Sequence, residues 1–388
     1  MNVSLCPICK NTHLRVFLQR SDVPVHQNLL MNSQKSARAT TRGALKLSVC
    51  ENCGFVFNQA FDLSLLSYGQ DYDNTQSCSD YFDSYLDDLV KELVEHQGVR
   101  NCTIVEVGCG KGHFLRKLIN YPGANNTGYG FDPSYIGPLS DVNGRLNFRK
   151  CYYDQNCTDV SADIVVCRHV IEHVPNPLEM LHSVRSALKP NAQTRVFFET
   201  PCVNWILSNK VIWDFFYEHC SLFSAESLKL AFQGSGFNVT HVKHVFKGQY
   251  LWLEARPTNK HEMSSVQNQT LELATAYTIE EDNLIKKWLL RLYDLSQQGK
   301  LALWGAGAKG ATFANLIDPN ATIFDCVIDI NPNKHGHYIP GSGHLIVSPL
   351  EIAERGISTA ILMNPNYREE SLRLLEQAGA KINLINWS

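Results

Sequence analysis

A glycine-rich turn that begins with an acidic residue is the strongest indication of chemistry in this sequence. It runs from Glu106 to Gly112 as E-V-G-C-G-K-G, after an apolar stretch and before a helical one. Glycine permits a tight turn and a close approach of backbone to ligand, and a following helix N-terminus offers free N–H groups. The pattern predicts a nucleotide-type site that contains Glu106, Gly108, Cys109 and Gly110.

The residues around this loop distinguish between three ligands. A triphosphate fits poorly, because Gly112 follows Lys111 where a Walker motif needs Ser or Thr. A dinucleotide also fits poorly, because the spacing is G-x-G-x-G. Glu106 suits a cationic ligand, and Asp132 ends a second predicted strand, where a carboxylate binds two ribose hydroxyls. Together these carboxylates predict S-adenosylmethionine, which carries an amino group and a sulfonium.

The elements that must position this loop follow an alternating β/α pattern. Strands are expected at 103–107, 128–132, 145–153, 163–167 and 195–199, with β-rich runs at 237–245 and 250–255. The last two runs are too close together for a crossover helix, so we expect antiparallel neighbours. With Asp132 and the R-H-V-I-E-H run from Arg168 to His173, this α/β pattern over residues 66–258 resembles the class I methyltransferase fold.

A polar segment, Tyr72 to Ser79, precedes an amphipathic helix. It resembles the segment that closes over the methionine end of the cofactor in related methyltransferases. This resemblance adds Tyr72 and Ser79 to the expected cofactor site, and the run after the fourth strand adds Arg168. The alternative is a loop and helix N-cap, in which Ser79 only satisfies backbone donors.

Four of the thirteen cysteines are arranged as a metal site. The pairs Cys6/Cys9 and Cys50/Cys53 form C-x2-C…C-x2-C, a spacing that suits a structural Zn²⁺ held by four thiolates in a domain of residues 1–65. A redox dithiol would not explain two matched pairs. The odd total of cysteines indicates reduced thiols in a reducing compartment.

A second glycine loop occurs near the C-terminus. After a linker expected at 259–278 and a helix from about Ile279, a short strand precedes G-A-G-A-K-G at 305–310, and Asp329 ends the next strand. The spacing alone predicts a dinucleotide site. Beside a methyltransferase domain, a substrate-holding role is more economical for this α/β domain, 279–388, with Gly305, Gly307, Lys309 and Gly310 as binding residues.

Composition narrows the partners. The net charge of -3 gives no basic surface for nucleic acid or an anionic membrane. No apolar stretch approaches ~20 residues and the start of the sequence lacks a signal-peptide core, so we expect a cytoplasmic protein. Monomer and homodimer both remain open.

The stretch after the fifth predicted strand should face the acceptor, because ligands of open α/β sheets bind beyond the strand ends. It contains Tyr217, Glu218 and His219. In extended backbone the phenol and the imidazole would share one face. His can remove a proton beside a carbonyl, Tyr can donate to the enolate oxygen, and Glu can orient or polarise. The alternative is a buried helix entry with polar capping residues.

The combination of the four cysteines, the methyltransferase domain, Tyr217–His219 and the second glycine loop resembles the 3-C-methyltransferases of nucleotide-linked 4-keto-6-deoxy sugars. The resemblance implies that His219 is the general base at C3, that Tyr217 and Glu218 stabilise the enolate, and that His173 lies near the keto sugar. It also implies that the outer domains frame a nucleotide sugar. The charged Arg168–His173 run and the less aromatic segment after Tyr72 depart from the family and indicate a side branch.

Three other functions remain open from the residues. An O- or N-methyltransferase of a small metabolite would need no enolising base. An RNA base methyltransferase with a zinc module would share the cysteines and the loop, although the acidic pI disfavours RNA. A non-catalytic binding protein would keep cofactor affinity without methyl transfer.

Overall fold

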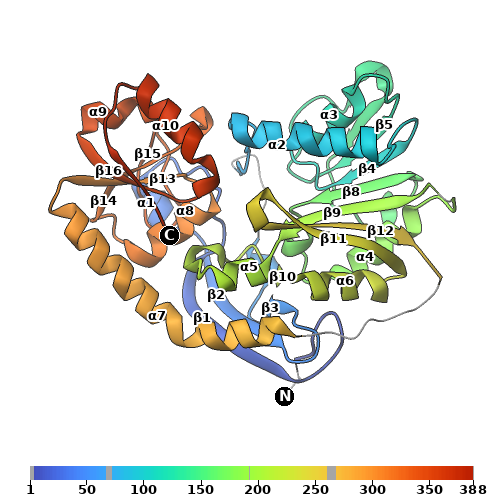
Figure 1. The fold of residues 1–388 in the computed structure, drawn as a ribbon, viewed down its shortest axis with the longest axis horizontal. Helices are drawn as coiled ribbons and strands as arrows, with labels where there is room; N and C mark the ends of the chain where they lie inside the picture. The colour runs from blue at the N-terminus through green and yellow to red at the C-terminus, as the bar shows by residue number, and fades with distance from the viewer. Residues whose placement is uncertain (1–3, 67–71, 192, 260–267, 388) are drawn as a thin grey trace.

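The predicted strand Thr103–Val107 lies in the middle of the largest sheet of the computed structural model, which describes residues 4–66, 72–191, 193–259 and 268–387 (Figure 1). Its side chains are buried on both faces, as expected for a central parallel strand. The eight strands, in spatial order, are β11 (Phe237–Val245), β12 (Tyr250–Pro257), β9 (Arg195–Pro201), β8 (Ile164–Arg168), β4 (Thr103–Val107), β5 (Thr127–Phe131), β7 (Leu146–Arg149) and β6 (Ser140–Asp141).

The strand directions of this sheet match the class I pattern. Strands β9, β8, β4, β5 and β7 are parallel, whereas β12 pairs antiparallel with both β9 and β11. Apolar helix faces cover both sides, with α2 and α3 on one face and α4 and α6 on the other (Figure 1). The helices of this unit are α2 (Asp80–Lys91), α3 (His113–Asn120), α4 (Pro177–Ala187), α5 (Val203–Ser208) and α6 (Ala225–Gly234).

The third predicted strand is shorter than expected. Strand β7 ends at Arg149, which pairs with Phe131, the last residue of β5, so no strand remains beside the next residues. The expected continuation to Tyr153 is therefore wrong. Cys151, Tyr152 and Tyr153 instead border the cavity beside the first glycine loop.

The N-terminal sheet incorporates a piece of the central region. Its strands are β1 (Leu14–Pro24), β2 (Arg42–Cys50), β3 (Val56–Asn58) and β10 (Ser221–Leu222), with the short helix α1 (Gln34–Arg38) between β1 and β2. Ser221 pairs with Phe57 and Leu222 with Val56. The segment just before β10, which contains Tyr217 to His219, is consequently drawn against the N-terminal unit.

The C-terminal unit is a five-stranded parallel sheet. Its strands, in spatial order, are β15 (Ile346–Val347), β14 (Phe324–Ile328), β13 (Lys300–Trp304), β16 (Ile357–Leu362) and β17 (Asn383–Asn386), and its helices are α7 (Gln269–Ser296), α8 (Ala308–Ile317), α9 (Ile352–Arg355) and α10 (Arg368–Gln377). Short 3₁₀ turns include η5 (Ile171–His173), η6 (Ile212–Asp214) and η8 (Pro332–Lys334).

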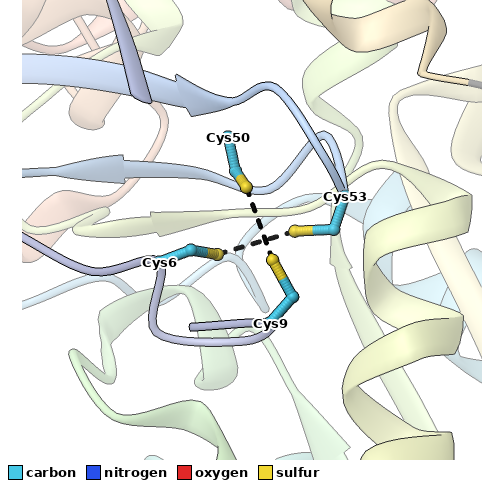
Figure 2. A group of neighbouring side chains, drawn as sticks. All are labelled: Cys6, Cys9, Cys50 and Cys53. Atoms are coloured by element: carbon cyan, nitrogen blue, oxygen red, sulfur yellow. Dashed lines mark hydrogen bonds between the residues drawn. The ribbon is translucent and has the colours of Figure 1, made fainter. Parts of the chain in front are cut away.

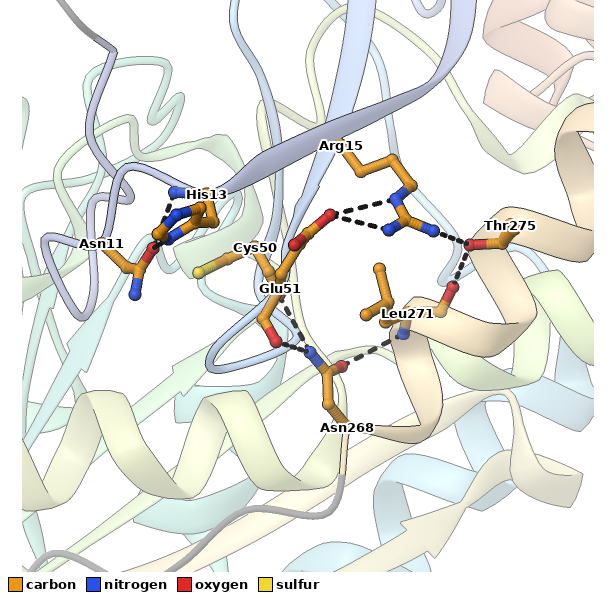
Figure 3. A network of polar contacts seen from close by, with 8 residues as sticks. All are labelled: Asn11, His13, Arg15, Cys50, Glu51, Asn268, Leu271 and Thr275. Carbon is orange, nitrogen blue, oxygen red and sulfur yellow. Dashed lines mark hydrogen bonds and ion pairs between the residues drawn. The ribbon is translucent and has the colours of Figure 1, made fainter.

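Helix α7 begins at Gln269, ten residues before the expected start at Ile279, so residues 269–278 are not a linker. Asn268 caps the helix by accepting from the Leu271 amide at 3.1 Å, and its Nδ2 donates to the carbonyls of Cys50 and Glu51 (Figure 3). The rest of the expected linker, residues 260–267, lies outside the described residues. Within the described ranges, no helix combines the length and apolar character that a bilayer crossing requires.

Candidate active site

The first glycine loop is built as a tight turn between β4 and α3. Gly108, Gly110 and Gly112 all have positive φ. A Cβ on Gly108 would lie 2.1 Å from Val170 Cγ2, and one on Gly112 would lie 2.4 Å from the Phe148 ring. A Cβ on Gly110 would meet nothing within 4 Å, because this position opens onto a cavity of about 1050 Å³. The loop therefore approaches a ligand closely at Gly110.

The two expected cofactor carboxylates border this cavity. Burial raises the pKa of Glu106 to about 8, and its Oε2 is buried without a hydrogen-bond partner among the described residues. Asp132 accepts from the Gly110 amide at 2.9 Å through Oδ2, and from Ser134 Oγ at 2.6 Å through Oδ1. An orphaned carboxylate oxygen fits the ammonium group of S-adenosylmethionine, and Asp132 beside the loop fits its ribose.

The other expected cofactor residues divide between two cavities. Tyr72, Cys109 and Arg168 border the large cavity, but the Arg168 Nε already donates to Glu199 at 2.6 Å. Ser79 does not border it. Its hydroxyl caps α2 at the Phe82 amide and donates to Glu370 Oε2 at 2.7 Å, so the helix-cap interpretation describes this residue better than cofactor contact.

A second cavity, of about 280 Å³, holds the expected catalytic histidines. His173 and His219 both border it, and their rings meet edge to face with centroids 4.8 Å apart. Burial, followed by the nearby His173, His169 and Lys309, lowers the pKa of His219 well below its ordinary value. The His219 Nδ1 is buried and makes no hydrogen bond within the described part of the chain. His219 is therefore a neutral imidazole near pH 7.

The two cavities adjoin. They share part of their lining, namely Tyr72, Asn74, Thr75, Gln76, His169 and His173. A methyl donor in the large cavity and an acceptor in the small one would therefore meet at this common boundary. This arrangement suits transfer between two bound molecules with little exposure to water.

The expected pairing of Tyr217 with His219 is wrong. The backbone is not extended here: the His219 amide donates to the Phe216 carbonyl at 3.2 Å and closes a turn. Tyr217 points to the N-terminal unit, where its hydroxyl accepts from the Asp62 amide at 2.7 Å and its ring lies against Gly43. Phe216, which sequence reasoning did not select, takes the place beside the imidazole, with ring centroids 4.0 Å apart.

Glu218 is fully buried and borders the small cavity. It accepts from the Gln27 amide at 3.0 Å and lies 3.4 Å from His26 Nδ1. These contacts hold the turn that contains His219 against the residues that follow β1 in the N-terminal unit. The carboxylate acts on the geometry of the site through this anchor.

A buried charge network underlies the boundary between the cavities, and sequence reasoning missed its centre, His169. Burial alone would lower its pKa, but the carboxylates of Glu199 and Glu172 raise the pKa of His169 to about 9. Glu172 also accepts from Thr200 Oγ1 at 3.0 Å. The R-H-V-I-E-H run contained His169, although its positive φ of 54° and its partners on β9 depend on the fold.

The second glycine loop closes the small cavity from the C-terminal unit. Gly305, Gly307, Lys309 and Gly310 all border it. A Cβ on Gly310 would lie 1.8 Å from the Gly305 carbonyl oxygen, so glycine permits close packing of α8 on β13. Lys309 is paired with Asp214 at 2.6 Å, whereas the buried Lys334 donates to the Ala306 carbonyl at 3.0 Å.

The acidic residue that follows this loop, Asp329, is bonded to backbone amides on both sides of its strand end. Asp329 accepts from the Ala306 amide at 2.6 Å through Oδ2 and from the Asn331 amide at 2.8 Å through Oδ1. Asp132 makes the same two kinds of contact at the first loop, with the amides of Gly110 and Ser134, so these bonds alone do not distinguish the two loops. The glycines at 305–310 form part of the wall of the small cavity.

The four expected metal ligands form one cluster (Figure 2). Their Sγ atoms all lie within 4.8 Å of one another, with Cys6 to Cys53 and Cys9 to Cys50 each at 3.5 Å. Four thiolates about 2.3 Å from a tetrahedral Zn²⁺ would lie about 3.8 Å apart, so the cluster could hold this ion. The turn that carries Cys50 and Cys53 also anchors α7. Asn268 donates to the Cys50 and Glu51 carbonyls, and Arg15 joins Glu51 to Thr275 (Figure 3).

Comparison with known proteins agrees with this architecture. Residues 79–242 match the family described as "Methyltransferase domain", and residues 260–382 match the family described as "C-methyltransferase C-terminal domain". The chain thus contains a class I S-adenosylmethionine-dependent methyltransferase domain followed by a C-methyltransferase C-terminal domain.

Curated relatives resemble a smaller part of the chain. The ubiquinone biosynthesis O-methyltransferase of Hydrogenovibrio crunogenus is 31% identical over 117 residues, which are 29% of this chain and 47% of the relative. That of Pseudoalteromonas translucida is 33% identical over 102 residues, covering 25% and 42% of the two chains. The chain spans about half or less of these relatives.

Among solved structures, an O-methyltransferase family protein from Burkholderia thailandensis gives a TM-score of 0.37 at 17% identity, covering 46% of this chain and 57% of its own. The 1,6-didemethyltoxoflavin-N1-methyltransferase of the same organism gives a TM-score of 0.35 at 13% identity, covering 46% and 81%.

Proposed function

We propose that this protein transfers a methyl group from S-adenosylmethionine to a carbon next to a carbonyl, and that its acceptor is a nucleotide-linked 4-keto-6-deoxy sugar methylated at C3. The observation that carries the proposal is the half-buried neutral imidazole of His219, whose Nδ1 is buried and which borders the cavity adjoining the expected cofactor site. When bound, S-adenosylmethionine supplies an electrophilic methyl group. The acceptor carbon must supply the electron pair.

His219 takes the C3 proton in this scheme. Its Nδ1 has no partner among the described residues, and its lowered pKa keeps it unprotonated near pH 7. The protonated His169 places positive charge near the developing enolate, and the His173 ring meets His219 edge to face. Glu218 holds the turn through Gln27, and Tyr217 has a structural role in place of the oxyanion role expected from sequence.

A phosphorylated acceptor is supported by the C-terminal wall of the small cavity. The ammonium group of Lys334 is buried beside the loop and meets a backbone carbonyl. Helix α8 begins after Gly307 without a side-chain cap, so its N-terminus leaves amide groups available for an anion. The match to a C-methyltransferase C-terminal domain supports carbon as the acceptor atom. The O-methyltransferase relatives match too little of the chain to carry over their acceptor.

The four thiolates are assigned a structural Zn²⁺, because a set of four cysteine ligands leaves no open position for substrate. The ion would fix the turn that carries Cys50 and Cys53. This turn anchors α7, and α7 belongs to the C-terminal unit.

The test is proton exchange at carbon without methyl transfer. A panel of nucleotide-linked 4-keto-6-deoxy sugars is incubated in deuterated water without cofactor, and deuterium at C3 is read by mass spectrometry. Wild type should exchange one C3 proton and, with methyl-labelled S-adenosylmethionine, form a C-methyl product. His219→Ala should lose both activities and keep cofactor binding. Methylation of oxygen or nitrogen, or methyl transfer that survives in His219→Ala, would contradict the proposal.

A further inference from the structure

We infer that Glu370, on α10 of the C-terminal unit, is a positioning residue for S-adenosylmethionine, which it does not contact. It acts by holding residues 72–79, called here the bridge segment, against both cavities. The inference rests on the proposed function, because it assumes that the large cavity binds the methyl donor. It assigns to the C-terminal unit a part in cofactor affinity as well as in acceptor binding.

Both carboxylate oxygens of Glu370 accept hydrogen bonds from the end of the bridge segment and the start of α2. Its Oε2 accepts from Ser79 Oγ at 2.7 Å, and its Oε1 accepts from the Asp80 amide at 2.7 Å and the Tyr81 amide at 3.5 Å. Glu370 is 8% exposed and Ser79 is 4% exposed. A buried carboxylate bonded to the first amides of α2 also interacts favourably with the helix dipole. Glu370 thus fixes the start of α2.

The bridge segment lies between the two sites that must exchange a methyl group. Tyr72, Asn74, Thr75 and Gln76 border both cavities. Ser77 borders only the large cavity, and Cys78 and Ser79 border only the small one. A shift of this segment would therefore change both cavities together.

The other end of the bridge segment is also held from outside the central sheet. The Asp73 amide donates to the Asn28 carbonyl at 2.9 Å, and Tyr72 forms a bridge with Leu29 of the N-terminal unit. The Asp73 carboxylate lies 3.3 Å from Lys111 Nζ, in the first glycine loop, and accepts from Asn333 at 3.4 Å. Asn333 and Glu370 both belong to the C-terminal unit, so that unit contacts each end of the segment.

Loss of Glu370 would leave the hydroxyl and two amides at this buried end without their acceptor. The segment would then occupy its binding-competent position for a smaller fraction of the time, and apparent cofactor affinity falls in proportion to that fraction. We expect Glu370→Ala to raise the Kd for S-adenosylmethionine roughly tenfold. Glu370→Gln keeps one carbonyl oxygen for the Asp80 amide and should give a smaller rise.

The experiment is calorimetric titration of S-adenosylmethionine into the full-length chain without acceptor. Glu369→Ala is the matched control, because Glu369 is the exposed neighbour on the same helix. Thermal unfolding reports overall stability, and amide hydrogen exchange reports residues 72–85 separately. The expected result is weaker binding and faster exchange in this range for Glu370→Ala, with wild-type behaviour for Glu369→Ala.

The outcomes separate the two hypotheses. Wild-type protein that fails to bind S-adenosylmethionine would overturn the proposed function. Wild-type binding with an unchanged Kd in Glu370→Ala, or an equal change in Glu369→Ala, would overturn the role of Glu370 alone. Should Glu370→Ala fail to fold, Glu370→Gln decides: an unchanged Kd and unchanged exchange at 72–85 would overturn the inference, and a raised Kd would support it.

Discussion

His173 and His219 lie edge to face at a centroid distance of 4.8 Å, although one follows strand β8 and the other precedes β10 of a different sheet. Their contact brings the end of the methyltransferase sheet against a turn that the N-terminal unit holds. Burial and the surrounding histidines and Lys309 lower the pKa of His219, so this relationship has a consequence for pH dependence.

We expect the acid limb of kcat/KM to lie below pH 6.5. The general base must be unprotonated, and a histidine with a lowered pKa stays unprotonated at pH values where an ordinary histidine is charged. A pH-rate profile from pH 5 to 8 with a C-methylation assay measures this limb. A limb at or above the ordinary value would contradict His219 as the base.

The same shift predicts a loss of stability in acid. The unfolded chain takes up a proton at His219 near pH 6.5 that the folded chain does not, so folding stability falls as pH drops below 6.5. Between pH 6.5 and 5.5 this group should cost about 1 kcal/mol. Urea unfolding of wild type and His219→Asn at both pH values isolates the contribution, which should be absent from the variant.

Glu106 should couple cofactor binding to proton release. Burial raises the pKa of Glu106 to about 8, so the free protein holds a proton there below pH 8. A bound ammonium group favours the carboxylate and lowers this pKa, so affinity for S-adenosylmethionine should increase as pH rises toward 8. Calorimetry in two buffers with different ionisation enthalpies measures the released proton. Glu106→Gln should bind more weakly, with no pH dependence from this group; equal proton release in the variant would contradict the assignment.

The thiolate cluster should bind one Zn²⁺ per chain and stabilise the fold. Cys53→Ser removes a fully buried ligand, and we expect it to lose the metal and about 3 kcal/mol or more of stability. Elemental analysis and chemical unfolding check both effects. Cys102→Ser, outside the cluster and both cavities, is the control and should keep full metal content. Full metal content in Cys53→Ser would contradict the site.

A substitution at Tyr217 tests its structural role in the fold against the catalytic role expected from the sequence. Tyr217→Phe removes the hydroxyl that binds the Asp62 backbone and leaves the ring on Gly43, so we expect a stability loss of about 1 kcal/mol. Methyl-transfer rates should stay within about twofold of wild type, because this hydroxyl lies outside the small cavity. A tenfold fall in kcat with unchanged stability would return Tyr217 to the catalytic group.

Local sequence patterns were sufficient to locate most strands of the central sheet. Apolar runs of strand length located β4, β8 and β9, and the distance from the glycine loop to Asp132 located β5. The short spacing of β11 and β12 indicated antiparallel pairing. These features depend on neighbours in sequence. The end of β7 was missed because it depends on where β5 stops. The start of α7 was missed because its first residues are mostly polar and resemble a linker. In the fold, Ala274 and Tyr277 of this part of the helix pack on the N-terminal sheet.

The sequence by itself determined the glycine turn after β4, its two carboxylates and the four thiols, because each is a short-range arrangement of residue types whose chemistry follows from spacing. Only the tertiary structure decided which face Tyr217, Phe216 and His219 present, since β10 pairs with a distant strand and turns the chain. It also decided the pKa of His219 and the contact of Glu370 with Ser79. Burial and long-range hydrogen bonds depend on residues far apart in sequence, so no local pattern contains them.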